Sequence, residues 1–214
     1  GLGKTIQAGL ILKELRARGL VERVLVVVPA SLQYQWRSEL RSKFNEDFEI
    51  FDGSAIRFHG RGGDNPWLKA DNIICSLPLA ARDANAASLA QAPWDLVIFD
   101  EAHRVRRHRQ GHTRIQPTTA YALADELKEL TYGMLLLTAT PMQLHPYELY
   151  SLIELVEPGL FKTYATYDRR RKSLPRLNTA MRHLQTWSAL SGAEREAAEH
   201  DVRAVLRKRD LDLS

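Results

Sequence analysis

Three residues near the start of the chain have the types and the order needed to bind phosphate. Gly3, Lys4 and Thr5 come directly before an apolar pattern of helical spacing. They match the second half of the loop GxxxxGK[ST], in which backbone N–H groups surround phosphates, the lysine contacts the β and γ oxygens, and the hydroxyl binds Mg²⁺. The following helix adds the positive end of its dipole. Because the first half of such a loop would precede Gly1, the tripeptide alone is a weak signal and favours a polar helix start.

Two adjacent carboxylates follow an apolar segment farther along the chain. The strand predicted at Leu96–Phe99 runs directly into Asp100 and Glu101. Open α/β sheets bind ligands at the carboxyl ends of their strands. There, Asp100 would hold Mg²⁺ through water, and Glu101 would orient or deprotonate an attacking water. An isolated Asp-Glu pair would favour a solvated turn, but combined with the upstream Lys4-Thr5 it predicts a nucleoside triphosphatase site.

A pair of hydroxyl residues follows the next predicted strand, Met134–Leu137. Thr138 and Thr140 would lie at its carboxyl end. Their hydroxyls could hydrogen-bond to His103, beside the acidic pair, and so link the nucleotide state to movement elsewhere. The alternative is a threonine-rich turn before a helix that Pro146 helps to start. The two interpretations do not exclude each other.

Two kinds of apolar segment alternate along the chain and would position these residues. Short aliphatic runs predict buried parallel strands at Val24–Val28, Phe48–Phe51, Ile73–Cys75, Leu96–Phe99 and Met134–Leu137. Apolar residues three and four apart predict helices at Ile6–Leu15, Leu32–Phe44, Leu77–Leu89 and Tyr121–Leu130. The alternation predicts an α/β fold with a doubly wound parallel sheet. Ser31 is expected to cap the second helix, and residues 59–66 to form a surface loop.

Composition excludes several classes of protein. Of 214 residues, 44% are hydrophobic and 26% are charged, which excludes a disordered tail or a collagen-like fibre. The single cysteine, Cys75, excludes an internal disulfide and a cysteine-based zinc site. No apolar run approaches the roughly 20 residues of a membrane-spanning helix, and a signal-peptide pattern is absent at the start. We therefore expect an intracellular, soluble chain.

Four motifs, in order, resemble those of superfamily 2 helicase-like ATPases and specifically the Swi/Snf family of double-stranded DNA translocases. Residues 1–7 (GLGKTIQ) resemble motif I, and residues 26–40 resemble motif Ia. Residues 100–103 (DEAH) resemble motif II, and residues 137–143 (LTATPMQ) resemble motif III. The resemblance covers residues 1 to about 162. It departs from the family at Leu144, where an asparagine is common.

The resemblance implies a RecA-like P-loop NTPase lobe, the first of two in a motor that uses ATP and Mg²⁺. The residues implied to bind ATP are Gly1, Leu2, Gly3, Lys4, Thr5 and Ile6. Mg²⁺ would be held by Thr5 and Asp100, and the implied catalytic residues are Glu101, Lys4 and Asp100. The residues implied to couple nucleotide state to movement are His103, Thr138 and Thr140.

The resemblance also implies a domain organisation. We expect an ATP-binding lobe over residues 1–160 and a basic, helical extension over residues 161–214 that leads toward a second lobe. We expect the chain to be one part of a longer protein. Without the arginine finger of the second lobe, this part alone would hydrolyse ATP poorly.

Double-stranded DNA is the partner that the resemblance implies. Residues 104–114 carry five arginines and two histidines, and arginines 169–171 with Lys172 form a second basic cluster. Such clusters can neutralise phosphates, although a solvated face is the ordinary alternative. The residues expected to contact DNA are Pro29, Ala30, Ser31 and Gln35 of motif Ia, together with Arg104, Arg106 and Arg107. Trp36 and Trp94 are expected to be core aromatics.

Two other functions are compatible with these motifs. An RNA or restriction-type helicase of superfamily 2 shares the phosphate loop and the DEAH sequence. A DNA-binding scaffold module that does not hydrolyse ATP is the other alternative, against which the intact Lys4, Thr5, Asp100 and Glu101 argue. The short spacing between motifs favours a bacterial protein, which would act in the cytoplasm beside the nucleoid; a eukaryotic one would act in the nucleus.

Overall fold

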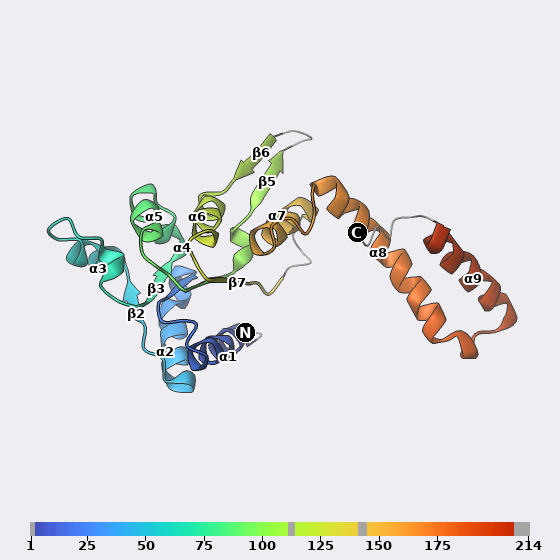
Figure 1. Cartoon of the computed structure of the whole chain (residues 1–214), viewed down its shortest axis with the longest axis horizontal. Helices are drawn as coiled ribbons and strands as arrows, with labels where there is room; N and C mark the ends of the chain where they lie inside the picture. Colours follow the sequence, from blue (N-terminus) through green and yellow to red (C-terminus); the bar gives the residue numbers. More distant parts are fainter. Residues whose placement is uncertain (1–2, 111–113, 141–144, 208–214) are drawn as a thin grey trace. The chain divides into compact units, whose positions relative to one another are not determined.

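Five aliphatic strands form one parallel sheet in the computed structural model, which describes residues 3–110, 114–140 and 145–207 (Figure 1). The strands are β1 (Val24–Val28), β2 (Glu49–Phe51), β3 (Asn72–Ser76), β4 (Leu96–Asp100) and β7 (Gly133–Leu137). Their order across the sheet is β2, β3, β1, β4, β7. Every predicted strand is present, and its ends differ from the prediction by at most one residue.

The register of the strands aligns their carboxyl ends. Val24 of β1 pairs with Leu96 of β4, and Asp100, the last residue of β4, pairs with Leu137 of β7. Since all neighbouring strands are parallel, the segments that follow β1, β4 and β7 leave the sheet at one edge. Motifs Ia, II and III therefore begin along the same edge.

Helices cover both faces of the sheet. On β1, Leu25 and Val27 pack on one face, whereas Val24, Val26 and Val28 pack on the other, and all five are buried. The helices on the second face are α1 (Lys4–Ala17) and α2 (Gln33–Phe44). Those on the first are α4 (Leu77–Ala80), α5 (Asp83–Ala90), α6 (Thr119–Lys128) and α7 (Pro146–Val156). The predicted doubly wound α/β arrangement is confirmed.

Helix α1 packs closely against α2 through a glycine, and ion pairs join α1 to the segment that follows α2. A Cβ atom at Gly9 would lie only 2.3 Å from the ring of Phe44, so a side chain there would push the helices apart. Near the other end of α1, the buried carboxylate of Glu46 pairs with Lys13 and Arg16, at 3.0 and 3.2 Å. Glycine inside a helix costs about 1 kcal/mol relative to alanine. The close approach of the two helices offsets that cost.

The prediction of one helix over Leu77–Leu89 is wrong, because the segment forms two helices. The backbone is extended at Arg82, between α4 and α5. The side-chain amide of Asn85 donates to the carbonyl of Leu79 at 2.8 Å, which satisfies an acceptor at the end of α4. Both helices bury apolar residues in the same cluster, so the apolar spacing continues across the break and conceals it.

The predicted capping role of Ser31 is also wrong. A one-turn 3₁₀ helix, Ala30–Leu32, follows β1, and its first hydrogen bond runs from Leu32 N–H to Pro29 O at 2.9 Å. Helix α2 then begins without a side-chain cap. Ser31 lies inside the 3₁₀ turn and is exposed.

A helix and a hairpin of two strands have no counterpart in the predictions. Helix α3 (Gly53–His59) begins after Asp52, whose carboxylate accepts from the N–H groups of Ser54 and Ala55. Strands β5 (Arg107–Gln110) and β6 (Arg114–Pro117) form an antiparallel hairpin (Figure 1). Both hairpin strands are polar and basic, so they lack the apolar signature from which strands are predicted.

The remaining described residues belong to a second compact unit, Phe161–Ser214, whereas the sheet belongs to the unit Gly1–Leu160. The second unit contains α8 (Tyr164–Gln185) and α9 (Gly192–Arg207), which contact each other. Helix α8 is capped by Thr163 and continues through Pro175. No helix among the described residues is both long and apolar enough to cross a membrane.

The buried thiol of Cys75 gives a direct test of this fold. Cys75 lies in β3 with no exposed surface, and burial raises the pKa of its thiol. A protonated, inaccessible thiol is unreactive. We expect iodoacetamide to label Cys75 in the native protein at least about 1,000-fold more slowly than in urea, since labelling requires unfolding. Mass spectrometry of the peptide that contains Cys75 measures both labelling rates. Similar rates in the native and the unfolded protein would show that β3 is not buried on both faces.

Candidate active site

A lysine and two carboxylates meet at the carboxyl edge of the sheet. Lys4 is the first residue of α1, and its Nζ lies 2.8 Å from Asp100 Oδ1 and 2.6 Å from Glu101 Oε1. Asp100 ends β4 and is 3% exposed. The two motifs that the sequence separates widely are thus in direct contact.

The balance of charge in this cluster keeps the lysine ionised. Burial lowers the pKa of Lys4, but hydrogen bonds and charge attraction from Asp100 and Glu101 outweigh it, so the pKa lies above the ordinary value of 10.5. This ammonium group stands at the first turn of α1, where the N–H groups and the helix dipole favour an anion. A phosphate group bound at this turn would meet both the N–H groups and the ammonium of Lys4.

Glu101 has a backbone conformation that few residues other than glycine adopt. Its φ of 51° and ψ of 47° lie in the left-handed region. This conformation costs on the order of 1 kcal/mol and is found at functional sites more than elsewhere. One oxygen of its carboxylate contacts Lys4, and the other lies 3.1 Å from His103 Nδ1. The sequence carries no signal for this strain.

Asp100 has a further partner that sequence reasoning missed. The indole N–H of Trp36 donates to Asp100 Oδ2 at 3.0 Å, and the N–H of Glu101 donates to Oδ1 at 2.8 Å. Trp36 is 2% exposed, as is Trp94, so the prediction that both are core aromatics is confirmed. Trp36 thus has a polar contact with the acidic motif in addition to its packing in the core.

The residues around Lys4 form the start of a helix. Gly3 precedes α1 in the left-handed conformation, with a φ of 70°. Thr5 is buried, and Ile6 is exposed. The pKa of Glu39 on α2 is lowered chiefly by a hydrogen bond from Gln35, with smaller contributions that include Lys43 and the Thr5 side chain. Gly1 and Leu2 lie outside the described residues.

His103, Thr138 and Thr140 are the residues predicted to couple nucleotide state to movement. His103 Nδ1 lies within ion-pair distance of Glu101 but lacks hydrogen-bond alignment. Thr138 Oγ1 accepts from the N–H of Thr140 at 3.3 Å. No hydrogen bond between His103 and either threonine occurs among the described residues. Coupling through these residues stays a prediction.

The segment after β1 presents polar groups to solvent beside the acidic motif. Ala30, Ser31 and Gln35 are exposed, and Pro29 is half-buried. Gln35 donates to Glu39 at 2.9 Å. Their contact with DNA stays a prediction.

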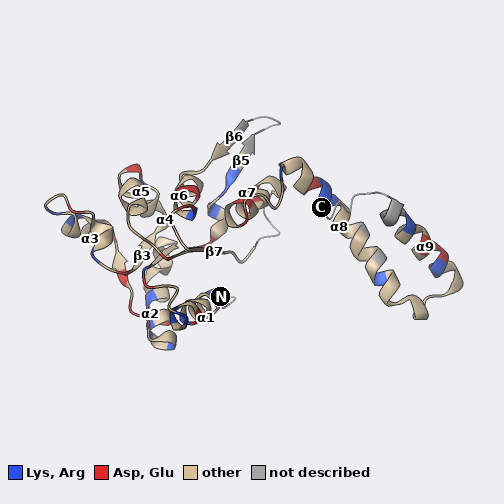
Figure 2. Ribbon diagram, in the orientation of Figure 1, with Lys and Arg blue, Asp and Glu red and all other residues tan. Residues whose placement is uncertain are grey.

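Two of the arginines expected to contact DNA are engaged by α7. Arg106 lies 3.1 Å from Glu148, and Arg107 pairs with Glu154. Arg107 also lies over the ring of Tyr121, 4.9 Å from its centroid. In Figure 2 the basic side of β5 lies beside acidic residues of α7. These pairs give both side chains a structural role, and DNA contact stays untested for them. Arg104, by contrast, is exposed.

The second basic cluster lies on α8. Arg171 and Lys172 both pair with Asp168, at 2.8 and 2.6 Å. Arg169 and Arg170 are exposed.

No group of three or more histidine, cysteine or acidic residues with metal-binding geometry occurs among the described residues. Mg²⁺ does not require one, because it is commonly bound through one or two protein ligands, substrate phosphates and water. Asp100 and Thr5 offer the hard oxygen donors that Mg²⁺ prefers. The ammonium of Lys4 already lies 2.8 Å from Asp100, so this carboxylate accepts a cationic neighbour. These residues therefore fit Mg²⁺.

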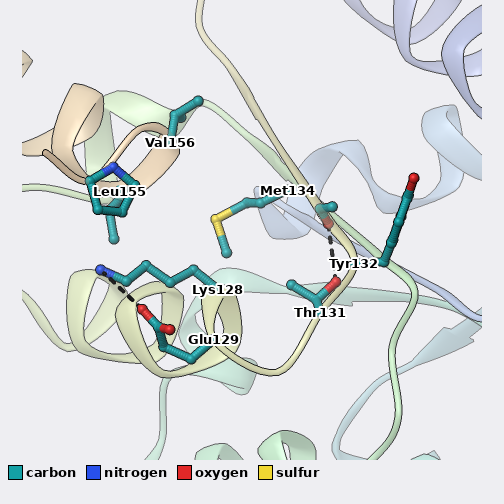
Figure 3. Close-up of a pocket in the computed structure, with 9 residues that line it drawn as sticks. Lys128, Glu129, Thr131, Tyr132, Met134, Leu155 and Val156 are labelled. Carbon is teal, nitrogen blue, oxygen red and sulfur yellow. Dashed lines mark hydrogen bonds and ion pairs between the residues drawn. The ribbon is translucent and has the colours of Figure 1, made fainter. Parts of the chain in front are cut away.

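A pocket of about 240 Å³ lies elsewhere, at the beginning of β7 (Figure 3). Gly133 and Met134 line it together with Leu155 of α7. Asp100 is paired with Leu137 at the other end of β7, so the pocket is separate from the Lys4–Asp100–Glu101 cluster.

Comparisons with known proteins bear on both the family and the fold. The family model of the SNF2-related domain matches residues 1–190. The SWI2/SNF2 ATPase core of Sulfolobus solfataricus, solved in complex with double-stranded DNA, is similar with a TM-score of 0.59 at 17% identity. That match covers 97% of this chain and 51% of the other.

The helicase domain of Pyrococcus furiosus Hef has a TM-score of 0.53 at 20% identity, covering 100% of this chain and 50% of the other. At such identities the likeness concerns the fold, and it confirms the expected RecA-like helicase lobe. The chain spans about half the length of both structures. Because the family model matches most of its length, this chain belongs to the SNF2-related domain family, as a helicase-like ATPase lobe of the Swi/Snf type.

Proposed function

We propose that this chain is the first ATP-binding lobe of an ATP-dependent, Mg²⁺-requiring translocase that moves on double-stranded DNA. The observation that carries the proposal is the contact of Lys4 with Asp100 and Glu101 at the carboxyl edge of the sheet. Family membership and the fold support it. Such a protein would act beside DNA, in the bacterial nucleoid or in a nucleus.

In the proposed reaction the lysine changes partners. Lys4 leaves the carboxylates and contacts the β and γ oxygens of ATP, while the first N–H groups of α1 face the phosphates. Thr5 and Asp100 would hold Mg²⁺, which supplies charge neutralisation at the transferred phosphoryl group. Gly1 and Leu2 would complete the loop, and Ile6 would continue it into the helix.

Release of Lys4 leaves Glu101 free to act on water. A carboxylate within hydrogen-bond reach of the attacking water can orient it and accept its proton. The left-handed backbone of Glu101 directs its carboxylate toward Lys4, on the same side as Asp100 Oδ1. His103, next to Glu101, is positioned to respond when that carboxylate changes partner.

Movement on DNA would require a second lobe. Closure of that lobe over ATP would bring its arginine finger to the site. Cycles of closure would advance the two lobes along the duplex. The unit Phe161–Ser214 would be the extension toward that lobe. Ala30, Ser31 and Gln35 would contact backbone phosphates, as would Arg104.

The first test concerns hydrolysis by the full-length protein. Lys4→Ala removes the phosphate-binding ammonium, and Glu101→Gln removes the group that acts on water. We expect each variant to lower DNA-stimulated ATP turnover at least about 100-fold, while Glu101→Gln keeps ATP affinity. Phosphate release measures turnover, and calorimetry measures affinity.

The matched control is Lys13→Ala, which removes a lysine from the same helix and its contact with Glu46, whereas Arg16 still pairs with that carboxylate and keeps α1 in place. Turnover by this variant should stay near that of the wild type. Unchanged turnover in Lys4→Ala and Glu101→Gln would eliminate the proposed site. Nucleotide binding without turnover in the wild type would favour the scaffold alternative.

The second test concerns the nucleic acid. Because phosphate contacts to both strands need duplex geometry and no base stacking, we expect duplex DNA to stimulate ATPase more than single strands or RNA. Ser31→Glu adds a negative charge that should cost about 1 kcal/mol, or about fivefold in DNA affinity at low salt.

Ser38→Glu places the same charge at an exposed position farther along α2 and serves as the control. Greater stimulation by RNA or single strands would favour the helicase alternatives. If Ser31→Glu and Ser38→Glu lower DNA affinity equally, the segment at Ser31 is not part of the DNA interface.

A further inference from the structure

We propose that Trp36 is a positioning residue for the metal-binding carboxylate. Its indole N–H holds Asp100 Oδ2, so that Oδ1 is the oxygen that faces Lys4 and the Mg²⁺ side of the site. The inference rests on the proposed function, since it assigns Asp100 to Mg²⁺. It assigns to a core tryptophan a role that the motif pattern does not indicate.

The three hydrogen-bond donors around Asp100 divide its two oxygens between them. Oδ1 accepts from Glu101 N–H at 2.8 Å and lies 2.8 Å from Lys4 Nζ. Oδ2 accepts from Trp36 Nε1 at 3.0 Å. A carboxylate that is only 3% exposed needs such partners because burial removes water from it. Trp36 therefore determines which oxygen points away from the site.

Trp36 is the rigid partner, and Lys4 is the exchangeable one. The Trp36 ring is 2% exposed and belongs to the same packed cluster as Leu40 and Ile98. An indole offers one donor in a fixed direction and no acceptor, whereas a lysine ammonium sits on a flexible stem. When Lys4 moves to phosphate, the indole and the Glu101 N–H remain on Asp100 and preserve its orientation.

The choice of acceptor separates Trp36 from the other buried tryptophans. Trp94 donates to the backbone carbonyl of Leu89, and Trp67 donates to the hydroxyl of Ser88. A neutral, nearby acceptor is enough to satisfy a buried indole in those cases. Trp36 instead reaches an ionised group at the end of β4, and hydrogen bonds to charged groups are the stronger ones.

The test uses Trp36→Phe in the full-length protein, which keeps an aromatic ring and removes the N–H. Calorimetry measures ADP affinity over a series of Mg²⁺ concentrations. We expect the Mg²⁺ concentration for half-maximal strengthening of ADP binding to rise about tenfold, as for loss of a partner behind a metal ligand. ADP affinity without Mg²⁺ should not change.

Trp94→Phe is the matched control, because Trp94 has the same 2% exposure and the same 3.0 Å hydrogen-bond length. Its Mg²⁺ dependence should equal that of the wild type. An unchanged Mg²⁺ dependence in Trp36→Phe, or the same shift in both variants, would overturn the proposal.

A second measurement needs no folded Trp36 variant and no nucleotide. In metal-free protein labelled with ¹⁵N-tryptophan, Asp100→Asn should move the Trp36 indole N–H resonance and leave that of Trp94 in place. A stationary Trp36 resonance would show that the hydrogen bond is absent and would overturn the proposal.

The two measurements also separate this inference from the proposed function. If the wild type shows no Mg²⁺-dependent ADP binding, the proposed function fails and the metal role of Trp36 fails with it, even when the indole resonance moves. If the wild type binds Mg²⁺ and ADP but Trp36→Phe binds them equally well, the positioning role alone is wrong.

Discussion

The ion pairs of Lys4 with Asp100 and Glu101 depend on one constraint, the parallel register of β1, β4 and β7. Parallel strands bring their carboxyl ends to one edge, and β4 delivers two carboxylates there. Packing of α1 against α2, with Gly9 against Phe44, sets where the first turn of α1 meets that edge. A shift of either layer would separate the lysine from the carboxylates.

Burial makes this cluster energetically different from the surface pairs of the same chain. An exposed ion pair contributes about 0–1 kcal/mol, whereas removing one partner from a buried pair costs about 3–5 kcal/mol. The Asp100 side chain is only 2% exposed, so Lys4 can leave it only if another cation takes its place. The proposed exchange meets this condition, because Mg²⁺ would arrive together with the ATP phosphates. The Trp36 N–H keeps one oxygen satisfied throughout.

Sequence patterns predicted the elements that are governed by apolar periodicity and missed those that depend on polar contacts. The strands were predictable because buried parallel strands are continuous aliphatic runs, as in Val24–Val28. The break between α4 and α5 was hidden because it depends on Asn85. The β5–β6 hairpin was hidden because its strands are polar, and Arg107 and His108 of β5 pair with acidic residues of α7. At the site, residue types identified Lys4 and the carboxylates, whereas the left-handed backbone of Glu101 is visible only in three dimensions.

A structure of the full-length protein with Mg²⁺ and a non-hydrolysable ATP analogue would show whether Lys4 exchanges its carboxylate partners for phosphate. We expect Lys4 Nζ to lie on the β and γ oxygens of the analogue, away from Glu101, with Asp100 beside the metal and the Trp36 N–H still on Asp100 Oδ2. An analogue bound elsewhere, with the Lys4 contacts to Asp100 and Glu101 unchanged, would contradict the proposed exchange.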